Sequence, residues 1–322
     1  MVGSNLPKGL IVDLITPVTE DGCIDGTGLG RHLDRLLPYV QAVYISSPNA
    51  GSGTRLTVEQ RADLFDKTLV VIRGNIPVLA WITGDSCENT LKILELFRKK
   101  QRARNYRGRV IWVDTPLYYH SNRGLPGYYE KFCSQLDENI VLHNDPALVC
   151  DVDRALKRKN IRTAILKELS ENRKIGGLIF QGSLDRSYNY RRAVRARRDF
   201  RVYDGDESCF LDHPGSSGVV SAGANIAPEE WNKITVSSLS QNNEDAYPDQ
   251  LQQIWDRWSC LAELNNLYSG KSAAVLSRVL ADMGITAGVA REEGGNVIEA
   301  ANRIGEIIKS RAQGAGPTDK KH

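Results

Sequence analysis

The chain has 322 residues, of which 41% are hydrophobic and 25% are charged, and its formal net charge is +3. This composition is ordinary for a folded globular protein, the balanced charge gives no indication of a nucleic-acid partner, and the absence of an apolar run of about 18 residues argues against a membrane span. The six cysteines form no CxxC pair, and no secretory signal is evident at the start, so we expect a cytoplasmic protein without a zinc or redox motif.

Eight short apolar runs recur along the chain. They are rich in valine, isoleucine and aromatic residues, and turn residues bound most of them, which is typical of buried strands. The runs cover residues 10–17, 42–47, 77–83, 109–116, 139–146, 175–182, 201–207 and 218–225.

Helical patterns lie between these runs. Leu29, Leu33 and Leu36 recur with the period of one helix face, and Thr57 with Gln60 has the spacing of a capping box. Eight strand–helix alternations predict an α/β protein with a closed (βα)8 TIM barrel. An open doubly wound sheet is the alternative, but it would usually carry a GxGxxG turn after the first strand, and none is present.

The pattern changes after Asn225, where no further strand-like run occurs. Ile254, Trp258 and Leu261 share one helix face, and Val297, Ala301, Ile304 and Ile308 share another. We therefore predict a barrel over residues 1–232, a C-terminal helical region over 233–310 and a disordered tail over 311–322.

Polar residues gather where the predicted strands end, which is where barrels of this kind carry their active sites. Such a polar, acid-rich set suits a small-molecule pocket. Asx residues also favour turns and caps regardless of function, so some members are expected to be structural. The set includes Thr16, Ser47, Asn49, Tyr118, His143, Asn144, Asp145, Gln181, Asp204, Asp206 and Glu207.

Six segments together resemble the dihydrodipicolinate synthase/N-acetylneuraminate lyase family. They are LITPVTEDGCID, SPNAGSGTRLTVEQR, DTPLYYHSNRGL, HNDP, VYDGDE and GVVSAGANIAPEEW. The resemblance implies a (βα)8 barrel with a C-terminal helical domain, and a homotetramer built as a dimer of dimers. It also implies aldol chemistry on pyruvate, in which a lysine on the sixth strand forms a Schiff base with the keto acid.

The chain departs from the family pattern at the positions that carry this chemistry. Ile179 stands where the family has its Schiff-base lysine, and His143 stands where it has a tyrosine. Asn49 and Ala50 replace the hydroxyls that bind the pyruvate carboxylate, and Leu148 replaces an arginine clamp. The family's strand-four tyrosine, which reaches the neighbouring subunit's site, is retained as Tyr118.

These departures predict that the family's Schiff-base chemistry is absent, because isoleucine has no nucleophile. We expect Ile179 to point into the pocket over an apolar floor. The expected role is binding of a keto-acid-like or sugar-acid-like small molecule, or a non-catalytic role, without a cofactor. Tyr118 and His143 are the catalytic candidates. The pocket candidates are Ser47, Asn49, Ala50, Asn144, Leu148, Gln181, Asp204, Asp206 and Val220.

Two alternatives remain open. In the first, a repurposed lyase or aldolase uses a metal ion held by His143, Asp145 and Asp206, since imidazole and carboxylates are suitable ligands. In the second, a working lyase uses another lysine from an unexpected strand, although no strand-end segment contains one. The expected partners are a small molecule and further copies of this chain, with neither nucleic acid nor membrane.

Overall fold

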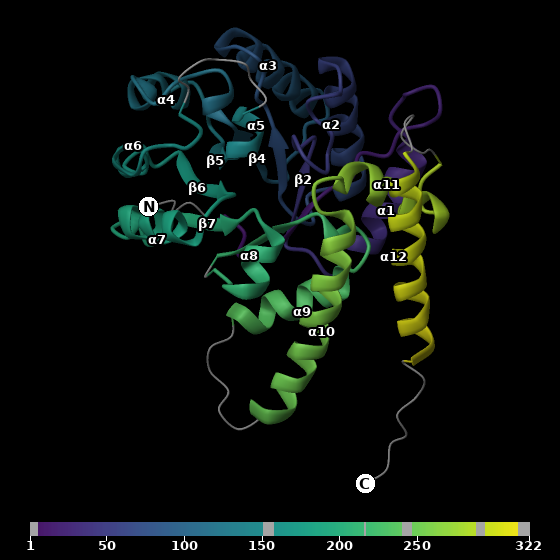
Figure 1. Ribbon diagram of the computed structural model, residues 1–322. Coiled ribbons are helices and arrows are strands. Elements are labelled where there is room, and N and C mark those ends of the chain that lie inside the picture. The colour runs from purple at the N-terminus through teal and green to yellow at the C-terminus, as the bar shows by residue number, and fades with distance from the viewer. Residues whose placement is uncertain (1–5, 151–157, 216, 240–246, 288–293, 315–322) are drawn as a thin grey trace.

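The computed structural model describes residues 6–150, 158–215, 217–239, 247–287 and 294–314. Eight parallel strands close into a barrel in sequence order, and helices surround them, which confirms the predicted (βα)8 fold (Figure 1). The strands are β1 (Gly9–Asp13), β2 (Ala42–Ile45), β3 (Val78–Trp81), β4 (Val110–Asp114), β5 (Asn139–Asn144), β6 (Ile175–Phe180), β7 (Arg201–Asp204) and β8 (Gly218–Ser221).

Helices follow each strand. The α-helices of the barrel are α1 (Gly26–Leu36), α2 (Val58–Ile72), α3 (Cys87–Ala103), α4 (Leu125–Cys133), α5 (Pro146–Cys150), α6 (Thr163–Leu169), α7 (Leu184–Val194) and α8 (Glu207–Asp212). Two short 3₁₀ helices, η1 (Pro116–Tyr118) and η2 (Gly223–Asn225), follow β4 and β8. The capping box predicted for α2 is present: Gln60 N donates to Thr57 Oγ1 at 3.1 Å, and Thr57 N donates to Gln60 Oε1 at 2.9 Å.

The barrel closes where β1 meets β8. Gly9 and Gly218 are register partners there, with φ angles of +131° and +113°. A Cβ on Gly218 would lie 1.9 Å from the Gly9 carbonyl oxygen. Glycine is therefore required at this seam, because a side chain would push the two strands apart.

Side chains alternate between the two sides of the barrel wall. On β1, Leu10 and Val12 pack in the core between strands and helices, whereas Ile11 packs in a second cluster, which we call the interior cluster. This alternation is the period of two expected for a strand, and it places the interior cluster inside the barrel. Its buried members are Leu6, Ile11, Ala42, Tyr44, Leu79, Trp81, Ile111, Val113, Val141, Leu148, Ile179, Tyr203 and Val220.

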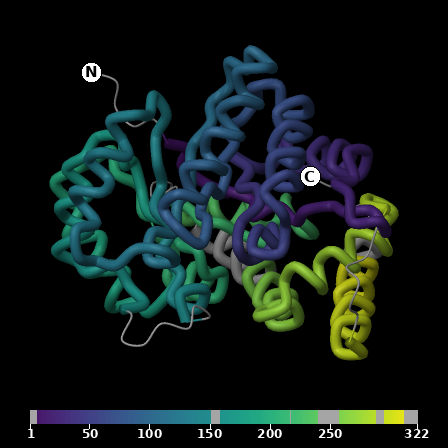
Figure 2. Tube along the Cα trace, turned by 90° about the horizontal axis from the view of Figure 1, so that it is seen from above, coloured from purple at the N-terminus to yellow at the C-terminus, as the bar shows by residue number. Residues whose placement is uncertain are grey.

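The C-terminal region consists of α9 (Pro228–Leu239), α10 (Tyr247–Tyr268), α11 (Ser272–Asp282) and α12 (Gly295–Gly314). Trp258 Nε1 in α10 donates to the Leu211 carbonyl at 3.0 Å, and Leu261 is buried. The α11 end of this region lies beside α1, where Arg31 Nε donates to the Ile285 carbonyl at 3.0 Å (Figures 1 and 2). The side chain of Ile254 and residues 315–322 of the expected tail lie outside the described residues.

Val297, Ala301 and Ile304 of α12 are buried together, as their shared helix face predicts. Within the described residues, we find no helix that combines the length and the apolar character needed to cross a bilayer.

Candidate functional site

An apolar floor lies inside the barrel below the carboxyl ends of the strands. Ile179 of β6 is 1% exposed and packs in the interior cluster with Tyr203 and Val220. A Cβ on Gly205 would lie 3.0 Å from Ile179 Cγ2, so the isoleucine is also packed tightly against the end of β7. Leu148, in the middle of α5, is buried in the same cluster. The atoms around Ile179 are therefore largely hydrocarbon.

Asp13 of β1 adds a buried carboxyl group to this interior. The Ser47 side chain and the Ala50 backbone hydrogen-bond to the carboxyl, whereas its Oδ1 atom has no hydrogen-bond partner. Burial raises the pKa of Asp13 to about 7, and Glu207 and Asp145 add to the increase, while the bonds from Ser47 and Ala50 oppose it. A carboxyl group with such a pKa can change its protonation state near neutral pH.

His143 of β5 lies across the barrel from β2. Its Nδ1 atom is 3.3 Å from the Tyr44 hydroxyl, and its Nε2 atom is buried without a partner. Burial lowers the pKa of His143, an effect that the Asp145 carboxylate opposes. The imidazole is therefore neutral at physiological pH. Burial and the nearby Asp13 carboxylate raise the pKa of Tyr44, which stays a neutral phenol.

Asp145 stands between this interior and the short helix α5. Its Oδ1 accepts hydrogen bonds from the backbone N–H groups of Ala147 at 2.9 Å and Leu148 at 3.0 Å. Its Oδ2 accepts from Asn49 Nδ2 at 3.3 Å, and Asn49 itself is exposed at the end of β2. Both oxygens of Asp145 are thus engaged in holding the loops around the mouth of the barrel.

Three of the predicted pocket residues serve the barrel wall and rim. Asn144 bonds to Asn160 Oδ1 at 2.9 Å and accepts from Ile161 N at 2.8 Å. Asp204 pairs with Arg191 at 2.9 Å, and Asp206 is exposed and caps α8. Asn144 and Asp204 do not join Asp13 and His143, because residues adjacent along a strand point to opposite sides of the wall, and Asp206 lies beyond β7 as the N-cap of α8.

The remaining predicted residues surround the interior at different depths. Ser47 and Ala50 are buried beside Asp13, Leu148 and Val220 belong to the interior cluster, and Gln181 is half-buried after β6. Tyr118 of η1 is half-buried, with its ring centroid 6.5 Å from that of Trp81.

The metal site considered for His143, Asp145 and Asp206 is not assembled. Across the ranges that the structure describes, no three His, Cys, Asp or Glu side chains form a group suited to a metal ion. The reason is local: Asp145 is bonded to α5 and Asn49, and Asp206 Oδ1 accepts from Cys209 N at 3.1 Å as the N-cap of α8.

Sequence reasoning missed Asp13 and Tyr44. The signal was present, because Asp13 is an acid inside an otherwise apolar strand run. Tyr44 is its register partner on β2, so both side chains face the same side of the sheet. A carboxyl group in the middle of a buried parallel strand needs an explanation, since burying a charge is costly.

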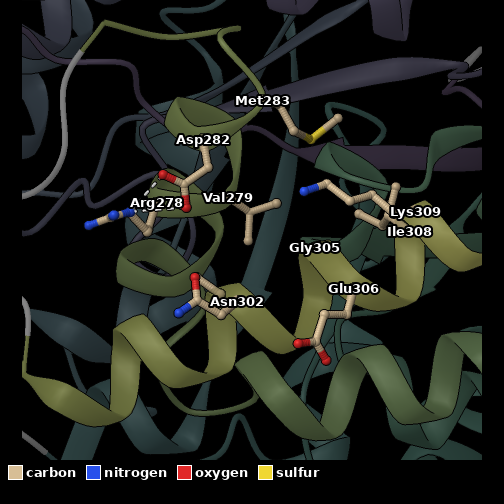
Figure 3. A pocket seen from close by; sticks show the side chains of 10 residues that line it. Arg278, Val279, Asp282, Met283, Asn302, Gly305, Glu306, Ile308 and Lys309 are labelled. Atoms are coloured by element: carbon tan, nitrogen blue, oxygen red, sulfur yellow. Dashed lines mark hydrogen bonds and ion pairs between the residues drawn. The ribbon is translucent and has the colours of Figure 1, made fainter.

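The C-terminal helices carry a separate hollow of about 580 Å³ between α11 and α12 (Figure 3). Arg278 Nε and Asp282 Oδ1 form an ion pair across one edge at 2.8 Å, and Glu306 and Lys309 project from α12. The side chains there come from the surfaces of two helices. The buried polar atoms without partners that we describe above lie instead inside the barrel, so we place the candidate site there.

Comparisons with known proteins agree with this architecture. The model of the dihydrodipicolinate synthetase family matches residues 6–290. An uncharacterised DapA-like lyase of Thermococcus kodakarensis is 30% identical over 251 residues, which cover 74% of this chain and 79% of the relative. A 4-hydroxy-tetrahydrodipicolinate synthase of Sodalis glossinidius is 28% identical over 243 residues, which cover 74% and 77%.

Solved structures show the same fold. A monomeric dihydrodipicolinate synthase variant superimposes with a TM-score of 0.77 over 94% of this chain and 97% of its own, at 20% identity. The family match covers the barrel and most of the helical region. The chain therefore belongs to the dihydrodipicolinate synthetase family.

Proposed function

We propose that this chain binds a small keto-acid-like or sugar-acid-like molecule at the carboxyl ends of its strands and does not perform the family's Schiff-base chemistry. The observation that carries the proposal is the distribution of lysines. None lies in β1 to β8, and none of the lysines that the structure describes is buried. Iminium formation needs an amine inside the site, where burial can lower its pKa.

Ile179 supports the same conclusion. We propose that it takes the place of the family's lysine, and its surroundings are hydrocarbon from the interior cluster. A keto-acid carbonyl above this floor meets no nucleophile. The hydrocarbon side chains of this floor, which are those of Ile179, Leu148 and Val220, also offer no donor to an oxygen that gains negative charge during reaction. Loss of a covalent amine removes the whole route, because no later step can occur without the adduct.

The nearest lysines along the chain do not support a substitute nucleophile. Lys167 lies exposed in α6. Lys174 precedes β6, and its Nζ donates to the Asp137 carbonyl at 2.7 Å. It therefore lies at the amino end of β6, whereas the site lies at the carboxyl ends of the strands.

The metal-assisted lyase is the second candidate, and the arrangement of its proposed ligands does not favour it. It would need His143 and strand-end carboxylates to turn toward one ion. The carboxylates of Asp145 and Asp206 instead accept hydrogen bonds from backbone N–H groups in the first turns of α5 and α8. If no small molecule binds at the strand ends, the remaining reading is a non-catalytic role.

Borohydride trapping tests the proposal. The full chain is incubated with pyruvate and sodium borohydride, and the intact mass is measured. We expect no adduct and no synthase or sialic acid lyase turnover. A pyruvate adduct on any lysine would contradict the proposal.

Two variants sharpen the test. Ile179→Lys restores an amine, but we expect it to recover little turnover, because Asn49, Ala50, His143 and Leu148 still lack the family's relay and clamp. Ile179→Leu is the matched control, since it keeps an apolar side chain of the same size. Recovery of substantial turnover by Ile179→Lys alone would show that the rest of the site has not diverged.

A further inference from the structure

Asp13 and His143 each place inside the barrel one buried polar atom that lacks a hydrogen-bond partner. The two atoms are Asp13 Oδ1 and His143 Nε2, on side chains that are 7% and 2% exposed by residue. Buried polar groups are nearly always paired, because an unpaired donor or acceptor loses its bonds to water without replacement. Two such atoms in one interior indicate that a further group with polar atoms belongs there.

The two atoms belong to one region of the interior. Asp13 on β1 is the register partner of Tyr44 on β2, and the Tyr44 hydroxyl contacts His143 Nδ1 at 3.3 Å. His143 is in turn the register partner of Ile179. Parallel register partners point to the same side of a sheet. Asp13 and His143, which we call the polar pair, therefore lie next to the apolar floor.

The charged groups that act on Asp13 are carboxyl groups. Glu207 and Asp145 lie close enough to Asp13 to act on its ionisation, and Tyr44 and His143 are both neutral. Within the described ranges, Arg61 is the only buried lysine or arginine.

Arg61 lies close enough to Tyr44 to act on its ionisation, but its guanidinium is engaged at the end of β3. Its Nη1 donates to the Thr83 carbonyl at 3.0 Å, its Nη2 donates to the Trp81 carbonyl, and its guanidinium lies 4.6 Å from the centre of the Trp81 ring. A ligand carboxylate next to Asp13 would therefore lie near the carboxyl groups of Asp13, Glu207 and Asp145, while Arg61 directs its Nη1 and Nη2 groups to backbone carbonyls, which opposes binding of the carboxylate.

We propose that Asp13 and His143 bind the uncharged, hydroxyl-bearing end of the ligand, and that any acid group of the ligand stays toward the mouth. A ligand hydroxyl donates to Asp13 Oδ1, and a neighbouring oxygen or hydroxyl pairs with His143 Nε2. This orientation rests on the proposed function, in which a small molecule binds at the strand ends. It names the part of the ligand that enters the barrel as a polyol or hydroxy-carbonyl group.

Two three-carbon probes separate the possibilities. Hydroxyacetone and pyruvate share a methyl ketone and differ in a neutral CH₂OH group against a carboxylate. Binding of each to the full chain is measured by NMR titration at about pH 8. We expect hydroxyacetone to bind at least about ten-fold more tightly, because one unfavourable charge contact readily costs that factor.

The substitution Asp13→Asn removes the charge and keeps the shape. We expect it to weaken hydroxyacetone binding, strengthen pyruvate binding and bring the two affinities within about three-fold of each other. Asp34→Asn is the matched control, since it removes the exposed carboxylate of Asp34 in α1, outside the barrel, by the same change of side chain. The control should leave the preference unchanged.

A pH series on the unmodified chain gives a second measurement that needs no variant. The preference for hydroxyacetone should shrink from about pH 8 to about pH 6, as Asp13 takes up its proton. Tighter binding of pyruvate at pH 8, or an Asp13→Asn chain with the original preference, would overturn this orientation and leave the proposed function standing. Absence of binding by both probes would instead contradict the small-molecule function itself.

Discussion

Asp13 makes the stability of the fold depend on pH. Its pKa is 3.8 as an ordinary carboxyl and about 7 in the folded chain, chiefly because of burial. Below the lower value both states are protonated, so its burial carries no charge penalty. As the pH rises toward the higher value, the unfolded chain releases this proton first, and the folded state loses up to about 4 kcal/mol of relative stability.

Asp13→Asn should remove this loss. We expect the difference in unfolding free energy between the variant and the unmodified chain to favour the variant more at pH 8 than at pH 4. Urea unfolding at both pH values measures this difference. Asp206→Asn, at an exposed carboxylate, should show no such pH-dependent gain. An equal effect of Asp13→Asn at the two pH values would mean that Asp13 is not the titrating group.

At the residue scale, the sequence predicted the strand ends better than the contacts made there. It placed His143 and Ile179 on their strands, because apolar runs mark strands whatever surrounds them. It could not pair His143 with Tyr44, since the two side chains meet across the barrel. Nor could it separate Asp204 and Asp206 from the interior, because a hydrogen bond to Arg191 or a helix cap depends on the folded neighbours.

At the scale of elements, Glu207 joins three parts of the chain. This first residue of α8 accepts hydrogen bonds from the hydroxyl of Ser221, the last residue of β8, from Gly223 N at 2.8 Å and from the Tyr268 hydroxyl of α10 at 2.9 Å. Burial raises the pKa of Glu207, while these bonds oppose the increase. The C-terminal helices are thus tied to the carboxyl end of the barrel through one buried carboxyl group.

Tyr268→Phe tests this tie, because it removes one donor and leaves the ring. We expect a loss of about 2 kcal/mol in the free energy of unfolding, the usual size for a hydrogen bond to a buried charged group. Tyr188→Phe is the control, since Tyr188 is 60% exposed. Equal stability of the Tyr268 variant and the unmodified chain would show that water or another donor replaces the hydroxyl.

The elements themselves followed from periodicity, with their ends less well defined. The alternation of eight apolar runs with helical patterns predicted every strand of the barrel. The helix α12 ends at Gly314, four residues beyond the predicted end at residue 310, because the apolar pattern used for the prediction was followed only to Ile308. Helix ends are set by capping and by neighbouring segments, which a periodic pattern does not record.

At the scale of the whole molecule, we propose that the chain assembles as a dimer of dimers, with Tyr118 near a subunit boundary. The half-buried Tyr118 lies in η1 after β4, with its ring tilted by 64° against that of Trp81. The fold alone does not decide the matter, since one structural neighbour is a monomeric synthase variant. Aromatic side chains of this kind are enriched at protein interfaces.

Sedimentation at micromolar concentration should therefore show a tetramer, or at least a dimer. Tyr118→Ala should shift the distribution toward smaller species, whereas Tyr188→Ala, at an exposed position of α7, should not. A single monomeric species for the unmodified chain would refute the assembly.

The closed order of the strands also has a consequence for synthesis on the ribosome. β1 can pair with β2 soon after both have been made, but its other edge stays unpaired until β8 is made, because Gly9 of β1 pairs with Gly218 of β8. Until that late segment emerges, β1 presents an open edge of the kind that mispairs with other chains. Asp13 lies on this waiting strand. The interior that holds Asp13 and His143 is therefore closed only after β8, which ends at Ser221, has been made, and products truncated before β8 should lack the site.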